Sequence, residues 1–343
     1  MRIGILGLPQ AGKRTLFTLL TGRKVPETRR PEDSLEGVAS IRDPRVDVLS
    51  GLCKPESTVY AENHFVLCPD VVEGTGTREW LEAARRCDLL CLVVRDFESD
   101  LVYHPAGSID AGRDRANLGA ELLLADMMLV ERRLERLAKE AKAGATREQK
   151  VQTEALRRCL ATLEAERPLT AVELDDEQRV ALQMLNFLTL KPVLWAYNAA
   201  EDALGADRGP DAFAISARIE AEIAEIADAG ERREFLESLG LEAPGLDRMN
   251  AAAYDALGLM SFYTIGEDEV RAWTIRKGST APTAGGKVHS DIERGFIRVE
   301  VIKYDDLVKA GSEKAAKEHG KVAVKGRDYV IQDGDICHFL FNV

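Results

Sequence analysis

The residues best suited to chemistry stand near the start of the chain, in the run Gly7-Leu8-Pro9-Gln10-Ala11-Gly12-Lys13. Its two outer glycines let the backbone curl so that successive amides point inward at the oxygens of an anion. A helix that begins where the run ends adds the positive end of its dipole. The spacing matches GxxxxGK, in which the lysine reaches the β- and γ-phosphates of a nucleotide. The run therefore predicts a phosphate-binding loop.

The next position departs from this pattern. Phosphate-binding loops place Ser or Thr after the lysine to bind Mg²⁺ through the hydroxyl, whereas this chain has Arg14. A guanidinium has no lone pair for a metal, but it can pair directly with phosphate oxygens. Thr15 follows, yet one helical step turns a side chain by about 100°, so it cannot simply substitute. We expect an anion site without its usual Mg²⁺ ligand.

The elements that must position this loop indicate an α/β sheet. Residues 2–6 form an apolar strand before the loop, and residues 16–20 give the helix after it an apolar face. Further apolar strands are expected at 64–68, 88–94 and 194–197. Strands that alternate with helices favour a parallel, doubly wound sheet.

A long segment with helical periodicity comes next. Apolar residues recur at spacings of four and three over 123–141, as in a coiled-coil seam. Gly144 interrupts the pattern, which resumes over 156–163. The simplest structure is an antiparallel helical hairpin inserted into the α/β domain, and two ordinary packed helices fit the same few heptads. From about residue 262 onward, β-rich segments (270–275, 296–302 and 329–331) alternate with glycine turns and predict a small α+β domain.

Composition narrows the class of protein. The chain of 343 residues is 45% hydrophobic and 30% charged, as in soluble globular proteins. No apolar run approaches the roughly 18 residues of a membrane span, and no secretory leader is expected, so we expect a cytoplasmic protein. The net charge of −12 argues against a protein that coats nucleic acid over its whole surface. The six cysteines lack CxxC spacing and are expected to be free thiols.

Several segments together resemble the YchF type of the Obg-like ATPase family. The resemblance begins at the Gly-Leu-Pro-x-x-Gly-Lys loop and covers essentially the whole chain in order. The other segments that carry it are Asp43-Pro44-Arg45-Val46-Asp47 with Lys54-Pro55, Phe187–Pro192, Asn198–Asp202, Glu269–Ile275, Gly295–Arg298 and Asp333–Val343.

This resemblance implies three domains. An Obg-type P-loop nucleotide-binding G domain would comprise residues 1–117 and 188–261. The helical hairpin insertion would comprise residues 118–187. A ubiquitin-like β-grasp domain of the TGS type would comprise residues 262–343.

The resemblance also implies a function: binding of ATP in preference to GTP, slow hydrolysis, and association with ribosomes or translation. GTPases generally recognise guanine through Asn-Lys-x-Asp, and the YchF group has Asn-x-x-Glu instead, matched here by Asn198 and Glu201. The longer Glu side chain would relax the preference for guanine. Ser216-Ala217 resembles the second base-contacting loop, whose backbone amides meet the ring. A ribosome or RNA contact is expected at residues 131–158, where nine Lys or Arg face five Glu, and a solvated helix face is the alternative.

Three departures from the family pattern affect positions that nucleotide hydrolysis needs. Arg14 replaces the Mg²⁺ ligand, Pro31 aligns with the metal-sensing Thr of the first switch, and Leu67 stands where the second switch has Asp. Asp70 stands where that switch has Gly. Phosphoryl transfer depends on metal charge and positioning, so we expect a loss on the order of 10³-fold or more in rate. Two alternatives remain: a slow ATPase or GTPase in which Asp70 rebuilds the metal site, and a scaffold that binds no nucleotide.

The sequence assigns no catalytic residue and no oligomeric state. The expected ligand is ATP or GTP, and Mg²⁺ is doubtful because its usual ligand is missing. The candidate nucleotide-binding residues are Gly7, Leu8, Pro9, Gln10, Ala11, Gly12, Lys13, Arg14, Thr15, Asn198, Glu201, Ser216 and Ala217.

Overall fold

The computed structural model describes residues 1–28, 30, 32–72, 78–100, 102–209 and 211–342. Its contacts divide the chain into two compact units, Met1–Gly37 with His64–Met249, and Val38–Asn63 with Asn250–Val343. Residues 38–63 thus group with the C-terminal part of the chain, whereas the sequence-based boundaries place them in the nucleotide-binding domain. Those boundaries stay a prediction. Pro31 and Val343, both named in the sequence analysis, lie outside the described residues.

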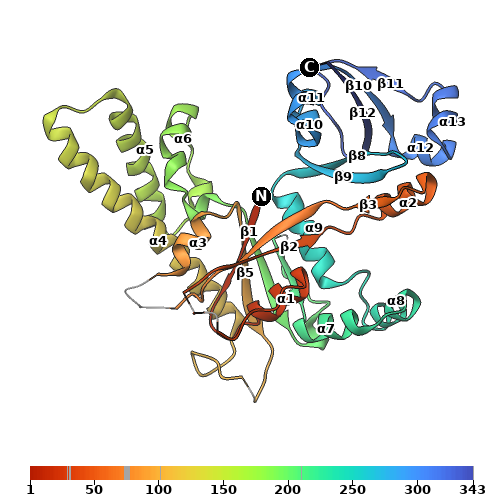
Figure 1. The fold of residues 1–343 in the computed structure, drawn as a ribbon. Coiled ribbons are helices and arrows are strands. Elements are labelled where there is room, and N and C mark those ends of the chain that lie inside the picture. Colours follow the sequence, from red (N-terminus) through yellow and green to blue (C-terminus); the bar gives the residue numbers. More distant parts are fainter. Residues whose placement is uncertain (29, 31, 73–77, 101, 210, 343) are drawn as a thin grey trace. The chain divides into compact units, whose positions relative to one another are not determined.

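A six-stranded sheet in the order β2-β4-β1-β5-β6-β7 contains the strand that precedes the phosphate-binding loop (Figure 1). Strand β1 pairs in parallel with β4 and β5, and β6 pairs in parallel with β5 and β7, which confirms the parallel sheet. The strands are β1 (Arg2–Gly7), β2 (Leu35–Ser40), β4 (Glu62–Leu67), β5 (Leu89–Asp96), β6 (Val193–Ala199) and β7 (Ala212–Ile215).

Helices α3 and α4 pack on one face of this sheet. Their side chains, Trp80 and Leu122 among them, share an apolar cluster with Leu6 of β1, Val66 of β4 and Leu92 of β5. Burial of this cluster stabilises the strands that end at the loop. The helices of this part of the chain are α1 (Lys13–Thr21), α3 (Trp80–Arg85), α4 (Ala111–Glu140), α5 (Arg147–Glu164), α6 (Asp176–Leu182), α7 (Ala217–Glu225) and α8 (Ala229–Ser238). Helix α9 (Gly245–Ala256) begins in this unit and continues into the other one from Asn250 onward.

The predicted helical hairpin is confirmed by α4 and α5, which lie side by side and extend away from the sheet (Figure 1). A capping box at Thr146, whose hydroxyl and backbone both pair with Gln149, starts α5 directly after the short connection. The apolar seam between the two helices includes Val130, Leu137 and Leu156. Helix α4 begins at Ala111, ahead of the periodic segment, so its first turns also pack on the sheet.

The second unit is built on another six-stranded sheet, in the order β11-β10-β12-β8-β9-β3. The short β3 from the N-terminal half pairs with β9 in parallel. Its strands are β3 (Ser57–Val59), β8 (Leu259–Thr264), β9 (Glu269–Arg276), β10 (Phe296–Lys303), β11 (Ala323–Lys325) and β12 (Asp335–Phe341). Its helices are α2 (Pro44–Cys53), α10 (Ala281–Val288), α11 (Ser290–Arg294), α12 (Tyr304–Ala310) and α13 (Glu313–Glu318).

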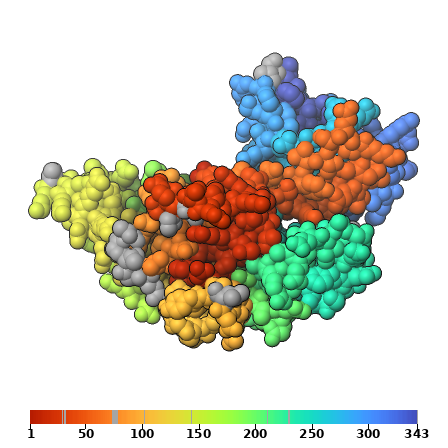
Figure 2. Space-filling view, turned by 60° about the horizontal axis from the view of Figure 1, so that its bottom comes forward, coloured from red at the N-terminus to blue at the C-terminus, as the bar shows by residue number. Residues whose placement is uncertain are grey.

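Residues 38–63 join this second unit through a shared core. Val46 and Leu49 of α2 are fully buried in one apolar cluster with Tyr263, Leu307 and Ile336. Figure 2 shows the orange surface of this segment lying directly against the blue surface of C-terminal residues. The small α+β domain expected after residue 262 therefore includes a piece of the N-terminal half.

The strand expected at 329–331 is wrong in extent, because only an isolated bridge joins Val330 to Thr280. The cysteines are free thiols as expected, and all but Cys53 are buried. None of the helices that the structure describes is both long enough and apolar enough to cross a membrane.

Candidate functional site

The loop between β1 and α1 depends on glycine at both of its ends. A Cβ atom at Gly7 would lie 2.3 Å from the carbonyl oxygen of Val93, and one at Gly12 would lie 2.1 Å from Nδ2 of Asn198. Gly12 also has φ 95°, a left-handed conformation that side chains disfavour, and it is the N-cap residue directly before α1, which begins at Lys13. The loop is therefore held in close contact with β5 and β6, directly before a helix N-terminus.

Lys13 is buried beneath this loop, with 4% of its surface exposed. Its Cδ atom lies 3.3 Å from the point that a Cβ of Gly7 would occupy, so the stem runs along the loop. Its ammonium group donates to the carbonyl oxygen of Leu8 and forms an ion pair of 2.9 Å with Oδ1 of Asp70. Burial lowers the pKa of Lys13, and the Asp70 carboxylate partly opposes that shift. The lysine thus already has one anionic partner inside the protein.

Asp70 reaches Lys13 because the chain after β4 stays beside β1. The amide of Cys68 donates to the carbonyl of Ile5, and the amide of Val71 donates to that of Gly7, both at 3.1 Å. Leu67, at the end of β4, is buried with 1% exposed and packs in the core. The side chain in the second-switch Asp position therefore cannot take part in the site, and the carboxylate three residues later lies at the loop.

Asn198 connects two of the predicted binding segments. It lies in β6 with 4% of its surface exposed. Its Nδ2 donates to the carbonyl of Ala11 at 3.1 Å, and its Oδ1 accepts from the amide of Ala217 at 3.0 Å. Ser216 caps α7 by accepting from the amide of Ile219. One buried side chain therefore fixes the phosphate-binding loop relative to the start of α7.

Glu201 lies just beyond β6 and is half exposed. Its carboxylate pairs with the guanidinium of Arg218 at 3.3 Å, and Arg218 also pairs with Glu222 at 3.6 Å. Sequence reasoning missed Arg218, which follows Ser216-Ala217 on α7. No local spacing points to it, because its partner stands on a different loop. The two predicted base-contacting loops are thus joined by an ion pair as well as by Asn198.

Arginine also surrounds the carboxyl ends of β5 and β6. The guanidinium of Arg208 lies 4.7 Å from the ring centre of Tyr197 and pairs with the carboxylate of Asp96. Arg115 lies 4.8 Å from the ring centre of Trp195 and donates to the Tyr197 hydroxyl at 3.0 Å. Both arginines were missed from the sequence. Both lie against side chains of β6, the strand that contains Asn198.

The side chains at this site offer few ligands to Mg²⁺. Arg14 and Thr15 are both exposed on the first turn of α1, and Arg14 has no oxygen to offer. The nearest carboxylate that the structure shows at Lys13 is that of Asp70, which is already paired. Across the described ranges, no group of three or more His, Cys, Asp or Glu side chains is placed to hold a metal. The described donor set does not fit the usual Mg²⁺ site of a phosphate-binding loop.

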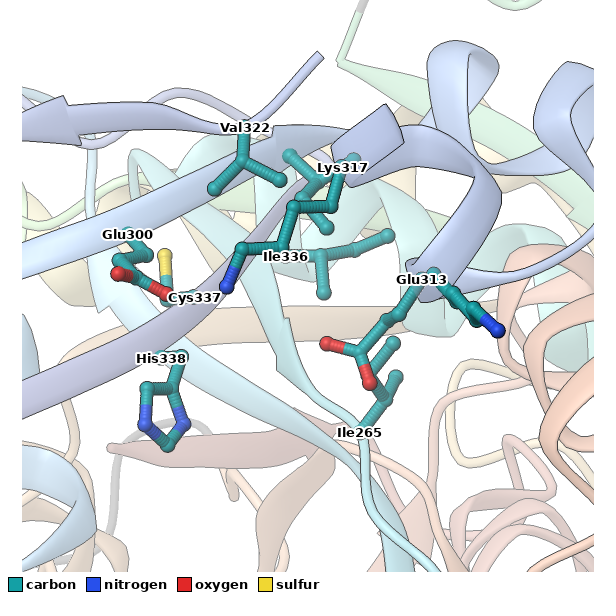
Figure 3. Close-up of a pocket in the computed structure, with 10 residues that line it drawn as sticks. Ile265, Glu300, Glu313, Lys317, Val322, Ile336, Cys337 and His338 are labelled. Atoms are coloured by element: carbon teal, nitrogen blue, oxygen red, sulfur yellow. The ribbon is translucent and has the colours of Figure 1, made fainter. Parts of the chain in front are cut away.

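A separate cavity of about 510 Å³ lies in the second unit (Figure 3). Glu313 and Lys317 of α13 border it, and Glu300 and His338 come from β10 and β12. Its lining mixes both charges with apolar side chains such as Ile336. The residues predicted for nucleotide binding are not among those that line it.

Comparison with known proteins identifies a matching family and several relatives. Residues 259–342 match the YchF-GTPase_C family, described as a protein of unknown function (DUF933). The chain is 39% identical to "Ribosome-binding ATPase YchF" of Escherichia coli O157:H7 over all of this chain and 99% of that protein. The protein of the same name from Bacillus subtilis is 38% identical, with 99% of each chain covered.

A solved structure agrees over the same length. The Schizosaccharomyces pombe YchF GTPase superposes with a TM-score of 0.85 and 29% identity, covering 99% of this chain and 97% of that one. The expected fold class, a P-loop α/β protein with a helical hairpin and a further C-terminal β domain, is thereby confirmed. Full-length identity near 39% and the shared fold lead to one conclusion: this chain belongs to the YchF family.

Proposed function

We propose that this protein binds purine nucleotides, takes ATP in preference to GTP, acts on the ribosome, and hydrolyses nucleotide weakly or not at all. The observation that carries the proposal is the Asn198 connection. One buried side chain bonds both to the phosphate-binding loop at Ala11 and to the second base-contacting loop at Ala217. A nucleotide that contacts both loops would need them fixed relative to each other, and this side chain does so.

The phosphate end of the proposed site rests on backbone amides. Residues 7–12 curve ahead of α1, whose first turn carries no acidic side chain that would oppose an anion. Gln10 adopts φ 63°, a left-handed conformation that lets neighbouring backbone amides point into one concavity, as in an anion-binding turn. Phosphate oxygens are therefore proposed to bind the amides of this loop together with Lys13.

Recognition of the base in the proposed site depends on Glu201. Guanine offers two N–H donors that an unpaired carboxylate accepts, and the Glu201 carboxylate is instead shared with Arg218. An occupied acceptor gives guanine less advantage over adenine. This pairing supports the proposed preference for ATP.

Weak or lost hydrolysis is proposed from three positions. Arg14 offers no metal ligand, Leu67 is buried in the core, and Asp70 is paired with Lys13. A metal-assisted phosphoryl transfer loses both charge stabilisation and positioning under these conditions. The expected loss is on the order of 10³-fold in rate, or about 4 kcal/mol.

The ribosome is proposed as the partner because three relatives of nearly full coverage carry the name "Ribosome-binding ATPase YchF". The hairpin segment 131–158 supplies a local positive excess on a protein of net charge −12. Arg132 and Lys139 are exposed on α4. Cations on a hairpin that extends from the sheet can approach RNA phosphates.

The test is titration calorimetry with ATP and GTP, each with Mg²⁺ and with EDTA, alongside a measurement of phosphate release. Binding is expected for the unchanged protein and should be lost or greatly weakened in Lys13→Ala, with little turnover in either. Absence of all nucleotide binding to well-folded protein would instead favour the scaffold alternative.

A slow ATPase or GTPase with a rebuilt metal site is a second candidate, favoured by the closeness of the Asp70 carboxylate to Lys13. It predicts phosphate release that requires Mg²⁺ and disappears in Asp70→Asn. Turnover that is absent in both proteins would exclude this candidate.

A further inference from the structure

The ion pair between Asp70 and Lys13 occupies the functional centre of the proposed site. The lysine of a phosphate-binding loop serves both the β- and the γ-phosphate. Here its ammonium already donates to Leu8 and pairs with Asp70, so one of its three hydrogens is left for a ligand. A carboxylate therefore lies against the group that would bind a terminal phosphate.

The main chain that carries this carboxylate is held beside β1. Hydrogen bonds of 3.1 Å from Cys68 to Ile5 and from Val71 to Gly7 fix the chain on both sides of Asp70. Gly7 itself cannot shift toward β5, since it already lies against the carbonyl of Val93. Movement of Asp70 away from Lys13 would break at least one of these contacts, or require a new rotamer toward solvent.

We propose that the Asp70 carboxylate stands in for a terminal phosphate at Lys13, so that this site selects nucleoside diphosphates over nucleoside triphosphates. The inference rests on the proposed nucleotide-binding function and names the class of nucleotide that the site takes. Asp70 is a specificity-determining residue in this account. The base preference argued from Glu201 is independent of it.

The negative charge of Asp70 explains the proposed selection of diphosphates over triphosphates. A β-phosphate can meet the loop amides, the start of α1 and the remaining hydrogen of Lys13, with the Lys13–Asp70 pair left intact. A γ-phosphate must either displace Asp70 or lie beside it, and two negative groups within a few ångströms repel strongly in a partly buried site. Mg²⁺ usually offsets the charge of the γ-phosphate, and its hydroxyl ligand is replaced here by Arg14.

Among the described residues, the elements next to Lys13 bring no second carboxylate to its ammonium group. The first turn of α1 has no acidic residue, and Leu67 places a methyl-bearing side chain where the family pattern has a carboxylate. Asp70 is therefore the carboxylate that the described residues bring to Lys13. Its removal should change the affinity for triphosphates far more than that for diphosphates.

The experiment is calorimetric titration of the full-length protein with ADP and with ATP, in EDTA and in Mg²⁺. The unchanged protein should bind ADP about tenfold or more tightly than ATP, because the extra phosphate meets the carboxylate. Asp70→Asn keeps the shape of the side chain and removes its charge. It should tighten ATP binding and bring the two affinities within about threefold of each other.

The matched control is Asp328→Asn. Asp328 is an exposed carboxylate in the second unit, and the same neutralisation there should leave the ADP-to-ATP ratio unchanged. Circular dichroism and thermal melting establish that both variants are folded. If Asp70→Asn does not fold, the ADP-to-ATP ratio of the unchanged protein decides the question alone.

The outcomes separate this inference from the proposed function. Binding of neither nucleotide to the folded, unchanged protein would remove the proposed function itself. Binding of ADP and ATP with equal affinity would keep that function and overturn the role of Asp70. ATP binding that becomes tighter than ADP binding in Mg²⁺, and loses this gain in Asp70→Asn, would identify Asp70 as a metal ligand and also overturn the inference.

Discussion

The α-carbon of Gly12 faces the side-chain amide of Asn198 so closely that an added methyl group would lie 2.1 Å from Nδ2. Asn198 in turn holds Ala11 and Ala217 through its two polar atoms. The absence of a side chain at one residue thus permits the hydrogen bonds of the other. Substitution of either residue tests the same piece of geometry.

We expect Gly12→Ala to weaken nucleotide binding at least about tenfold, because the methyl group displaces Asn198 and strains a left-handed residue. Asn198→Ala should weaken binding comparably by freeing the two loops. Calorimetry with ATP and ADP measures both. Gly22→Ala is the control, since Gly22 also has a left-handed φ of 66° but has no atom within 4 Å of its added methyl group. Equal effects of Gly12→Ala and Gly22→Ala would show that strain alone acts.

Nucleotide choice should respond to Arg218. Arg218→Ala releases the Glu201 carboxylate, so the affinity for GTP should rise relative to that for ATP. Arg233→Ala removes a comparable exposed ion pair, with Glu237 on α8, and should leave the ratio unchanged. In the unchanged protein, ATP is expected to bind at least as well as GTP. GTP binding tenfold tighter than ATP binding would contradict the preference.

The residue at position 14 should determine whether nucleotide binding depends on Mg²⁺. Nucleotide affinity of the unchanged protein is expected to be similar in Mg²⁺ and in EDTA, because the usual hydroxyl ligand is missing. Arg14→Ser restores that hydroxyl and should make binding of ATP depend on Mg²⁺. Abolition of binding to the unchanged protein by EDTA would mean that other residues hold a metal.

The hairpin should contribute to ribosome binding through its cations. Reversal of Arg132, Arg136 and Lys139 to Glu is expected to weaken co-sedimentation with ribosomes and to flatten its salt dependence, with ATP affinity unchanged. Arg136 already pairs with Glu140 at 2.9 Å, so Arg132 and Lys139 should account for most of the effect. Unaltered co-sedimentation at low and moderate salt would make this a solvated helix face.

The control for the hairpin is a reversal of three exposed cations in the second unit. Lys287, Arg298 and Lys309 serve this purpose, because they give the same change in net charge. An equal loss from both triple variants would assign the effect to overall charge and not to the hairpin.

Stability should depend on Asp126 at the base of the hairpin. This fully buried carboxylate of α4 accepts hydrogen bonds from the amides of Leu188 and Thr189 and from the Thr189 hydroxyl. Asp126→Ala leaves three donors without this acceptor and should lower the free energy of unfolding by about 2–4 kcal/mol. Denaturant titration measures the loss. Glu131→Ala, an exposed change on the same helix, should have little effect.

The same carboxylate should make the free energy of unfolding depend on pH. Burial raises the pKa of Asp126 above its usual 3.8, and its hydrogen bonds only partly oppose this. The folded protein then binds this proton more tightly than the unfolded chain does. Its contribution to stability should therefore decline as the pH rises from 3.8 through the folded-state pKa, and Asp126→Ala should lack that slope. Parallel stability curves for the two proteins between pH 4 and 7 would contradict this assignment.

The features that could be predicted from the sequence are those that short runs of neighbouring residues determine. The loop before Lys13, the helical hairpin and the parallel strands each depend on residues close together in the chain, and each was found in the structure. The pairings of Lys13 with Asp70 and of Glu201 with Arg218 were not predicted. Such contacts join separate loops, and their geometry is decided by the strands that bring the loops together.

The position of residues 38–63 could not be predicted for the same reason. Strand β3 has only three residues, and its partner β9 comes late in the chain. A three-residue strand carries too little alternation to be recognised. The family pattern placed this segment with its sequence neighbours, whereas its buried residues, Val46 and Leu49, pack with residues such as Tyr263 and Leu307.

That packing has a consequence for how the protein must be made. During synthesis, α2 and β3 leave the ribosome long before β9 and α12, which complete their core. Until then Val46 and Leu49 have no apolar partners from the C-terminal residues, and such surfaces promote aggregation. Contacts of this sequence separation also slow folding, because a long loop must close before they form. Fragments that end before residue 250 would carry this exposed segment permanently, so the first unit should be expressed either in the full chain or with residues 41–61, which lie between β2 and β4, replaced by a short linker.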